Sequence, residues 1–311
     1  MEKNRVVVIG ASNVDIKGRS VSAVYSRMKN PGRIEITAGG VGRNIAENLS
    51  RIGIPTVLLS SVGERDFVSV IKDETGRAGV DISRIRVLEN VHSGIFMAVI
   101  NPRGELEASI SDMTALSYIT PDYVVSQKEV FDDADYLVLD ADIPEETLEL
   151  ALSVAREKGL PVCVEPVSPA KAKVMRHYLR NITLTTPNRE EVEVLVERPI
   201  ITSDDIKQAG MELLRRGVRY VIITLGPEGV YCASEEFSGF IPSISTLVVD
   251  SVGAGDALVA GVVAGFLWGV NFFEAVKYGI SAATLTLMTS HAVNPSISRE
   301  SLMEMFDKVR I

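Results

Sequence analysis

Short apolar runs rich in β-branched residues recur along the chain, and stretches with helical periodicity separate them. The run Arg5–Gly10 is typical, because it is continuously apolar and ends in glycine, as does a strand buried on both faces of a sheet. Similar runs are Thr56–Val62, Tyr136–Leu139, Val162–Glu165, Ile182–Thr185 and Tyr220–Thr224. Helical spacing of apolar positions is found over Gly42–Ile52, Glu145–Lys158, Arg189–Val196 and Ser203–Arg216. Strands that alternate with such helices form βαβ units, so the pattern predicts an α/β core of three layers around a mostly parallel sheet.

Two stretches interrupt this alternation. Residues 16–38 have no helical period and end in the alternating segment Gly32–Thr37, which predicts a strand. Residues 92–111 have the pattern of a hairpin whose turn is Asn101–Gly104. Together they predict a small separate β-sheet; a pair of decorated loops is the alternative. The core would then comprise residues 1–15, 39–91 and 112–311.

Charge and hydropathy narrow the possible partners. The chain has 311 residues and a formal net charge of -9, whereas a nucleic-acid-binding surface is normally basic, so nucleic acid is not expected as a partner. The apolar stretch 257–270 is interrupted by glycines, which predicts a buried helix rather than a membrane span. Because the N-terminus runs directly into an expected strand, we expect no signal peptide and a cytoplasmic protein.

Cysteine and histidine offer little chemistry. Cys163 and Cys232 are far apart in apolar surroundings, which favours core packing over a metal site. His92, His177 and His291 are not spaced as metal ligands. A zinc enzyme and a hydrolase with a histidine base are therefore not expected.

One segment combines an anion-binding loop with a carboxylate. In Asp250–Asp256, the small residues Gly253, Ala254 and Gly255 come just before an apolar helical run. Their N–H groups can approach an anion closely, and the N-terminus of a helix adds partial positive charge. A phosphoryl group held there would lie beside Asp256, which could take a proton from an attacking hydroxyl. The alternative is a glycine-rich helix start in which Asp256 only complements the helix dipole.

Polar residues also follow the first two expected strands. Asn13 and Asp15 come after the first strand and could bind substrate hydroxyls. Gly39 and Gly40 let a ligand lie against the backbone, and Asn44 in the following helix offers both a donor and an acceptor. Each of these residues could instead serve a turn or a cap.

Two later segments suit a nucleotide and its metal ion. Asn188 and Glu191 lie one helical turn apart, which suits a hydrated Mg²⁺. Gly226 and Gly229 follow Thr224 at the end of a strand, in a turn that could approach a phosphate. A helix cap at Asn188 and a hairpin turn at the glycines are the alternatives.

In this order and combination, the segments resemble the ribokinase-like (PfkB) family of carbohydrate and nucleoside kinases over essentially the whole chain. The signatures that carry the resemblance are Gly39–Asn44 and Asp250–Asp256. The resemblance implies an enzyme dependent on ATP and Mg²⁺, with a β-sheet lid formed by residues 16–38 and 92–111. It implies that Asp256 is the catalytic base and that Gly253–Gly255 form the anion hole.

The resemblance also implies binding roles. The residues that it places on the sugar are Asn13, Asp15, Gly39, Gly40, Asn44 and Asp142. Those that it places on ATP are Asn188, Thr224, Gly226, Gly229, Gly253 and Gly255, while Asn188 and Glu191 act on Mg²⁺ through water. Asp250 and Val252 match a site at which many members bind a monovalent cation such as K⁺, although His291 stands where Gly-Ala is more usual. The adenine pocket falls around residues 281–288.

Within the family, three segments resemble those of a nucleoside kinase: Asn30–Leu49, Ser111–Met113 and Glu165–Ser168. The first two fall where a lid would meet the part of the substrate beyond the ribose, so we expect Asp112 to contact a small-molecule nucleoside that is phosphorylated on its 5′-hydroxyl. A kinase of another sugar or nucleoside is the alternative, and a non-catalytic sugar or nucleotide sensor is an alternative of a different class. Apolar positions at Ile95, Met97, Val99 and Ile110 permit a homodimer through the lid.

Overall fold

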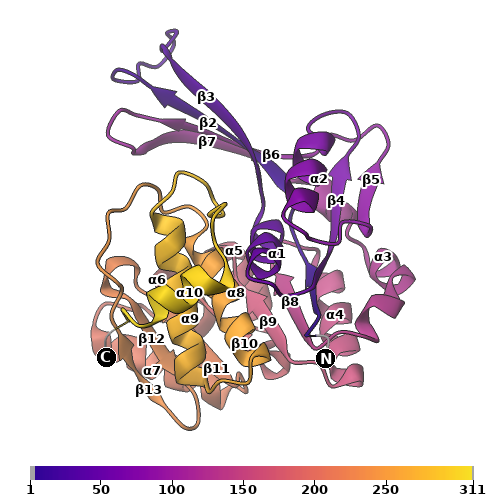
Figure 1. Cartoon of the computed structure of the whole chain (residues 1–311), viewed down its shortest axis with the longest axis vertical. Helices are drawn as coiled ribbons and strands as arrows, with labels where there is room; N and C mark the ends of the chain where they lie inside the picture. Colours follow the sequence, from indigo (N-terminus) through magenta and orange to yellow (C-terminus); the bar gives the residue numbers. More distant parts are fainter. Residues whose placement is uncertain (1–3, 310–311) are drawn as a thin grey trace.

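A mostly parallel sheet forms the centre of the protein (Figure 1). The computed structural model describes residues 4–309. The sheet has nine strands in the order β13-β12-β11-β10-β9-β8-β1-β4-β5, of which only the pairs β11–β12 and β12–β13 are antiparallel. The strands are β1 (Val6–Ile9), β4 (Thr56–Gly63), β5 (Ile85–Leu88), β8 (Tyr136–Asp140), β9 (Val162–Glu165), β10 (Leu184–Thr185), β11 (Tyr220–Thr224), β12 (Val230–Ala233) and β13 (Ser238–Ile241).

Side chains of the central strands alternate between two helical layers. Val7 and Ile9 of β1 belong to one apolar cluster, and Val6 and Val8 belong to the other. Because both faces of the sheet are covered, its strands are apolar throughout. The first layer holds α3 (Pro121–Ser126), α4 (Glu145–Lys158), α5 (Pro169–Met175), α6 (Arg189–Val196) and α7 (Ser203–Arg215). The second holds α1 (Val41–Arg51), α2 (Val68–Arg77), α8 (Ala254–Leu267), α9 (Phe272–Leu287) and α10 (Arg299–Phe306).

A second sheet projects from the layered core (Figure 1). It has four strands in the order β3-β2-β6-β7, of which β2 and β6 are parallel and the other pairs antiparallel. The strands are β2 (Asn13–Ser20), β3 (Gly32–Gly39), β6 (Gly94–Ile100) and β7 (Leu106–Asp112). We call it the small sheet.

The described residues form no helix long and apolar enough to cross a membrane.

The predicted fold class, a three-layer α/β core with an added small β-sheet, is confirmed. The predicted strand at Ile182–Thr185 is shorter, because a 3₁₀ turn at Leu179–Asn181 precedes it and pairing begins only at Leu184. The small sheet begins three residues earlier than residue 16, because Asn13 already pairs with Gly39. Other 3₁₀ turns are Thr114–Tyr118, Lys128–Phe131 and Gly226–Glu228. Residues 1–3 and 310–311 of the expected core lie outside the described residues.

Candidate active site

The site lies at the carboxyl ends of the parallel strands, where β1 meets the start of α1. Asp140, at the end of β8, accepts hydrogen bonds from the backbone N–H groups of Ala11 at 2.7 Å and Gly42 at 3.0 Å. It therefore fixes the end of β1 and the first turn of α1 together. Burial raises the pKa of Asp140 to about 6, because these donors only partly replace water and the Asp142 carboxylate lies nearby. Strand order reverses beside β1, which is where open α/β sheets form their ligand crevice.

The loop before α8 exposes backbone N–H groups without covering side chains, as an anion site requires. Gly253 has φ of 82° and no room for a side chain, since a Cβ there would lie 1.9 Å from the Ala292 carbonyl oxygen. Oδ1 of Asp250 accepts from the N–H of Val252 at 3.1 Å and shapes the loop. Helix α8 begins without a side-chain cap, which leaves donors of its first turn for a ligand.

Asp256 lies in that first turn, buried, and contacts the other signature segment. Its Oδ2 accepts a hydrogen bond of 2.8 Å from Nδ2 of Asn44 in α1. Burial raises the pKa of Asp256 to about 7, and the carboxylates of Asp140 and Asp15 add to the rise, while Asn44 and the Arg43 guanidinium oppose it. The carboxyl group is thus poised to exchange a proton near neutral pH.

Two of the residues predicted to bind substrate hydroxyls, Asn13 and Asp15, contact each other, and the Asp15 carboxylate is close enough to act on the charge of Asp256. Nδ2 of Asn13 donates to Oδ1 of Asp15 at 2.8 Å, and both residues are buried at the base of β2. Burial raises the pKa of Asp15. A Cβ on Gly39 would lie 2.6 Å from the Asp15 carboxylate, so glycine there is what lets β3 approach Asp15.

Asn188 and Glu191 form a reciprocal capping box at the start of α6. Oδ1 of Asn188 accepts from the N–H of Glu191, and Oε2 of Glu191 accepts from the N–H of Asn188, both at 2.9 Å. Nδ2 of Asn188 and Oε1 of Glu191 are not used in the box. Burial raises the pKa of Glu191, and it raises the pKa of Glu165 well above its usual value, with the Glu191 charge adding to that effect.

These carboxylates fit a divalent cation held through water rather than directly. Across residues 4–309, no group of three or more His, Cys, Asp or Glu side chains could enclose a metal ion. A cation with its own water shell nevertheless suits Glu191 and Glu165, because it would offset the charge that burial disfavours.

A cavity of about 580 Å³ lies beside the N-terminus of α8. Four residues predicted to bind ATP line it: Thr224, Gly226, Gly229 and Gly255. Three residues of the expected adenine segment, Ala283, Thr284 and Leu287, line it as well. Ala254, predicted for the anion hole, also lines the cavity, and the lining residues without a predicted role are Pro227, Val230, Ser243, Ile244, Ser245, Thr246, Val248, Ser251, Leu258 and Ile280.

Several predicted residues have other contacts. Oδ2 of Asp250, in the expected monovalent-cation site with the exposed Val252, accepts from Nζ of Lys17 at 3.3 Å and from Arg19 at 3.0 Å. Asp142 pairs with Lys171 at 3.2 Å. Asp112 is exposed and accepts from the N–H of Thr114 at 3.0 Å. Asn30 closes the β2–β3 loop, where its amide bonds to the backbone of Tyr25.

Residues absent from the predicted set also contribute to the site. Asp140, Glu165 and Lys17 bring charge to it, and Arg43 contacts Asn44 directly. Acidic residues at the ends of two expected strands were the available signal for Asp140 and Glu165. Lys17 had no such signal, because its partner Asp250 is 233 residues away. Arg43 had a local one, since its partner Glu47 follows four residues later in α1.

The chain is similar to known kinases over nearly its whole length. The family model described as pfkB family carbohydrate kinase matches residues 3–299. The pseudouridine kinase of Escherichia coli (strain K12) is 31% identical over 307 residues, with 98% of this chain and 97% of the relative covered. The guanosine-inosine kinase of Exiguobacterium acetylicum is 28% identical, with 94% and 98% covered. A solved carbohydrate kinase from Agrobacterium tumefaciens is 25% identical with a TM-score of 0.84, and 98% of each chain is covered.

The raised pKa of Asp256 predicts a stability effect that depends on pH. The folded state holds this proton up to about pH 7, against 3.8 for an ordinary aspartate, so unfolding releases it and stability falls as pH rises through that window. Asp256→Asn removes the buried charge. At pH 8 we expect its free energy of unfolding to exceed that of the wild type by about 1–2 kcal/mol, which raises its melting temperature by a few degrees. At pH 5 both differences should be smaller.

Thermal unfolding followed by circular dichroism at both pH values measures this difference. Asp133→Asn is the control, because Asp133 is exposed, and it should change neither value. An Asp256→Asn protein that melts below the wild type by the same amount at both pH values would contradict the expectation.

Proposed function

The chain belongs to the pfkB family of carbohydrate kinases, and within this family we propose that it transfers the γ-phosphoryl group of ATP to the 5′-hydroxyl of pseudouridine. A phosphotransferase with an alcohol group as acceptor is what the family match supports by itself. The hydrogen bond between Asn44 and Asp256 carries the proposal: it holds a buried carboxyl group with a pKa of about 7 in the uncapped first turn of α8, which supports a role for Asp256 as the base.

In the proposed reaction, Asp256 accepts the proton of the acceptor hydroxyl. Asn44 occupies Oδ2 of Asp256, so Oδ1 is the oxygen that receives the proton. Donors of Gly253, Ala254 and Gly255 stabilise the charge that develops on the transferring group. Asn188 and Glu191 would hold Mg²⁺ through water, and the ion bound with ATP would supply positive charge to the phosphates.

ATP occupies the cavity beside α8 in this proposal. Its apolar lining between α8 and α9, including Leu258, Ala283 and Leu287, suits the adenine ring. Thr224, Gly226 and Gly229 lie at the turn that meets the phosphates. Lys17 and Arg19 already supply two positive charges to Asp250, so we propose that turnover requires no K⁺.

The acceptor lies at the base of the small sheet in this proposal, and the sheet is the lid. Asn13 and Asp15 bind the ribose hydroxyls. Met113, which follows β7 directly, lies close to Asn13, because a Cβ on Gly94 would lie 3.0 Å from the Asn13 Cβ and 3.3 Å from the Met113 sulfur. This proximity supports a contact of Met113 with the base of a nucleoside whose ribose is bound by Asn13. Similarity to the E. coli pseudouridine kinase favours that substrate, and similarity to the Exiguobacterium enzyme keeps purine nucleosides as the second candidate.

The outer face of the small sheet supports a homodimer. Ile36, Ile16, Met97 and Ile110 lie in one row across all four strands, because each is directly opposite the next in register. Ile110 is 73% exposed and Met97 44% exposed. Asp15 and Lys17 alternate with Ile16 along β2 and so face the site, which leaves the apolar row on the outside. We also propose that the protein is located in the cytoplasm.

The substrate assignment is tested by release of ADP from MgATP with a panel of acceptors. We expect kcat/KM for pseudouridine to exceed the values for uridine, guanosine, inosine, ribose and fructose. Asp256→Asn should lose about 10²–10⁴-fold in kcat for that acceptor. A preference for guanosine or ribose would overturn the proposed substrate but keep the kinase. Absence of ADP release with every acceptor of the panel would favour a non-catalytic sensor. Near-full turnover by Asp256→Asn would remove Asp256 from the role of base.

The dimer is tested by the molar mass from light scattering after gel filtration. Ile110→Glu places a charge in the middle of the apolar row, so we expect it to convert a dimer into a monomer. Met303→Glu is the matched control, because Met303 is a comparably exposed apolar residue on α10, and it should leave the dimer intact. A wild-type monomer, or an Ile110→Glu dimer, would contradict this interface.

A further inference from the structure

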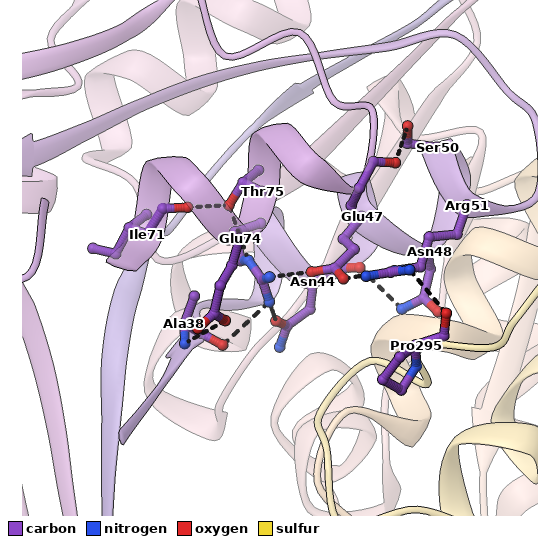
Figure 2. A network of polar contacts seen from close by, with 12 residues as sticks. Ala38, Asn44, Glu47, Asn48, Ser50, Arg51, Ile71, Glu74, Thr75 and Pro295 are labelled. Carbon is purple, nitrogen blue, oxygen red and sulfur yellow. Dashed lines mark hydrogen bonds and ion pairs between the residues drawn. The ribbon is translucent and has the colours of Figure 1, made fainter. Parts of the chain in front are cut away.

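Arg43 precedes Asn44 in α1, and its guanidinium is buried in a network that joins three elements (Figure 2). Its Nε donates to Oγ1 of Thr75 in α2 at 3.2 Å. Its Nη1 donates to the Ala38 carbonyl oxygen at 3.1 Å and to Oδ1 of Asn44 at 3.0 Å, and Nη2 pairs with Glu47. Figure 2 shows Thr75, Asn44 and Glu47 turned toward one centre between α1 and α2. The guanidinium is therefore held rigidly by its neighbours.

This contact determines which way the Asn44 amide points. A guanidinium has donors only, so the atom of Asn44 that faces Arg43 must be the oxygen. The amide nitrogen then faces the opposite side, where it donates to Oδ2 of Asp256 at 2.8 Å. With the amide reversed, its NH₂ group would face the guanidinium and its oxygen would face a carboxylate. Both contacts would then be repulsive.

We propose that Arg43 is a positioning residue for phosphoryl transfer: through Oδ1 of Asn44 it holds the amide N–H on Oδ2 of Asp256 and leaves Oδ1 of Asp256 for the acceptor hydroxyl. The proposal rests on the proposed role of Asp256 as base. Arg43 reaches Asp256 through Asn44, so its contribution is one of orientation and charge. Orientation matters because a small displacement of a catalytic group costs a large factor in rate.

The charges around Asp256 give Arg43 a second effect. Carboxylates face Asp256 from three strands, namely Asp140 of β8, Asp15 of β2 and Glu165 of β9. Arg43 is the cation that opposes them and lowers the pKa of Asp256. The charges that face Arg43 itself are Glu47 and Arg51 of α1, Glu74 of α2 and Asp15. Without Arg43, the carboxylates around Asp256 would be less compensated, and it would hold its proton to higher pH.

Arg51 provides a matched control within the same network. It pairs with the same carboxylate, Glu47, at 2.6 Å, and its Nη1 donates to the Pro295 carbonyl oxygen at 2.9 Å. Across residues 4–309, no hydrogen bond or ion pair joins it to Asn44 or Asp256. Loss of Arg51 therefore disturbs the ion pairs of α1 without releasing the Asn44 amide, which separates a structural role of the network from the proposed one.

The experiment compares Arg43→Gln, Arg43→Lys and Arg51→Gln with the wild type, using MgATP and the best acceptor of the panel between pH 5.5 and 9. For Arg43→Gln we expect kcat at pH 7 to fall at least about tenfold, with the acid limb of the profile moved to higher pH and part of the loss recovered at pH 9. KM for either substrate should change little. Arg43→Lys keeps the positive charge but loses the planar set of N–H donors of the guanidinium. The acid limb of its pH profile should therefore stay near that of the wild type, while kcat falls. Arg51→Gln should behave as the wild type.

A loss in Arg43→Gln that is equal at every pH, or that Arg51→Gln shares, would overturn the proposal. If Arg43→Gln does not fold, Thr75→Val is the second variant, because it removes the hydrogen bond from Nε of Arg43 to Oγ1 of Thr75 and keeps the positive charge. A kcat equal to that of the wild type would then contradict the proposal. A second readout needs no turnover: the carboxyl ¹³C signal of Asp256 should titrate at higher pH in Arg43→Gln than in the wild type. An unchanged midpoint overturns the proposal even if no acceptor is phosphorylated, whereas failure of the acceptor panel alone overturns the proposed function.

Discussion

The hydrogen bond from Asn44 to Asp256 joins two segments that lie 212 residues apart in the chain. It holds the N-terminal ends of α1 and α8 together, and the loop that carries Gly253 is positioned by the second of these helices. Asp140 fixes α1 to the end of β1 by accepting from the N–H groups of Ala11 and Gly42. Two buried carboxyl groups thus hold the end of β1, the start of α1 and the loop at Gly253 in fixed positions relative to one another.

Burial of these carboxyl groups carries a cost that the site uses. At both residues the loss of water outweighs the hydrogen bonds that replace it, so desolvation raises the pKa of Asp256 and of Asp140. A base with a raised pKa is well matched to proton transfer near neutral pH. The same imbalance of negative charge creates a demand for cations, which Arg43 meets within the protein and which Mg²⁺ would meet with the bound nucleotide.

Much of this arrangement could be predicted from the sequence, because the relevant signals are local. Continuous apolar runs separated by stretches of helical periodicity predicted the layered core. Small residues before an apolar helix predicted the position of the loop at Gly253. The hydrogen bond between Asn44 and Asp256 was not predicted, since the resemblance only placed Asn44 on the sugar and made Asp256 the base. Pairs such as Lys17 with Asp250, which are 233 residues apart, leave no periodic trace and follow from the way the small sheet meets the core. Asn188 and Glu191 show the limit of spacing arguments, since the same interval serves a metal site and a capping box.

The proposed chemistry depends most on the ionisation of Asp256, which carboxyl ¹³C NMR of aspartate-labelled protein measures directly. Comparison with Asp256→Asn identifies the signal, and a titration from pH 3 to pH 9 gives its midpoint. We expect a midpoint at about 7 for the free enzyme. A midpoint near that of an ordinary aspartate, about 4 or lower, would mean that Asp256 is not a desolvated base, and the proposed chemistry would have to be abandoned.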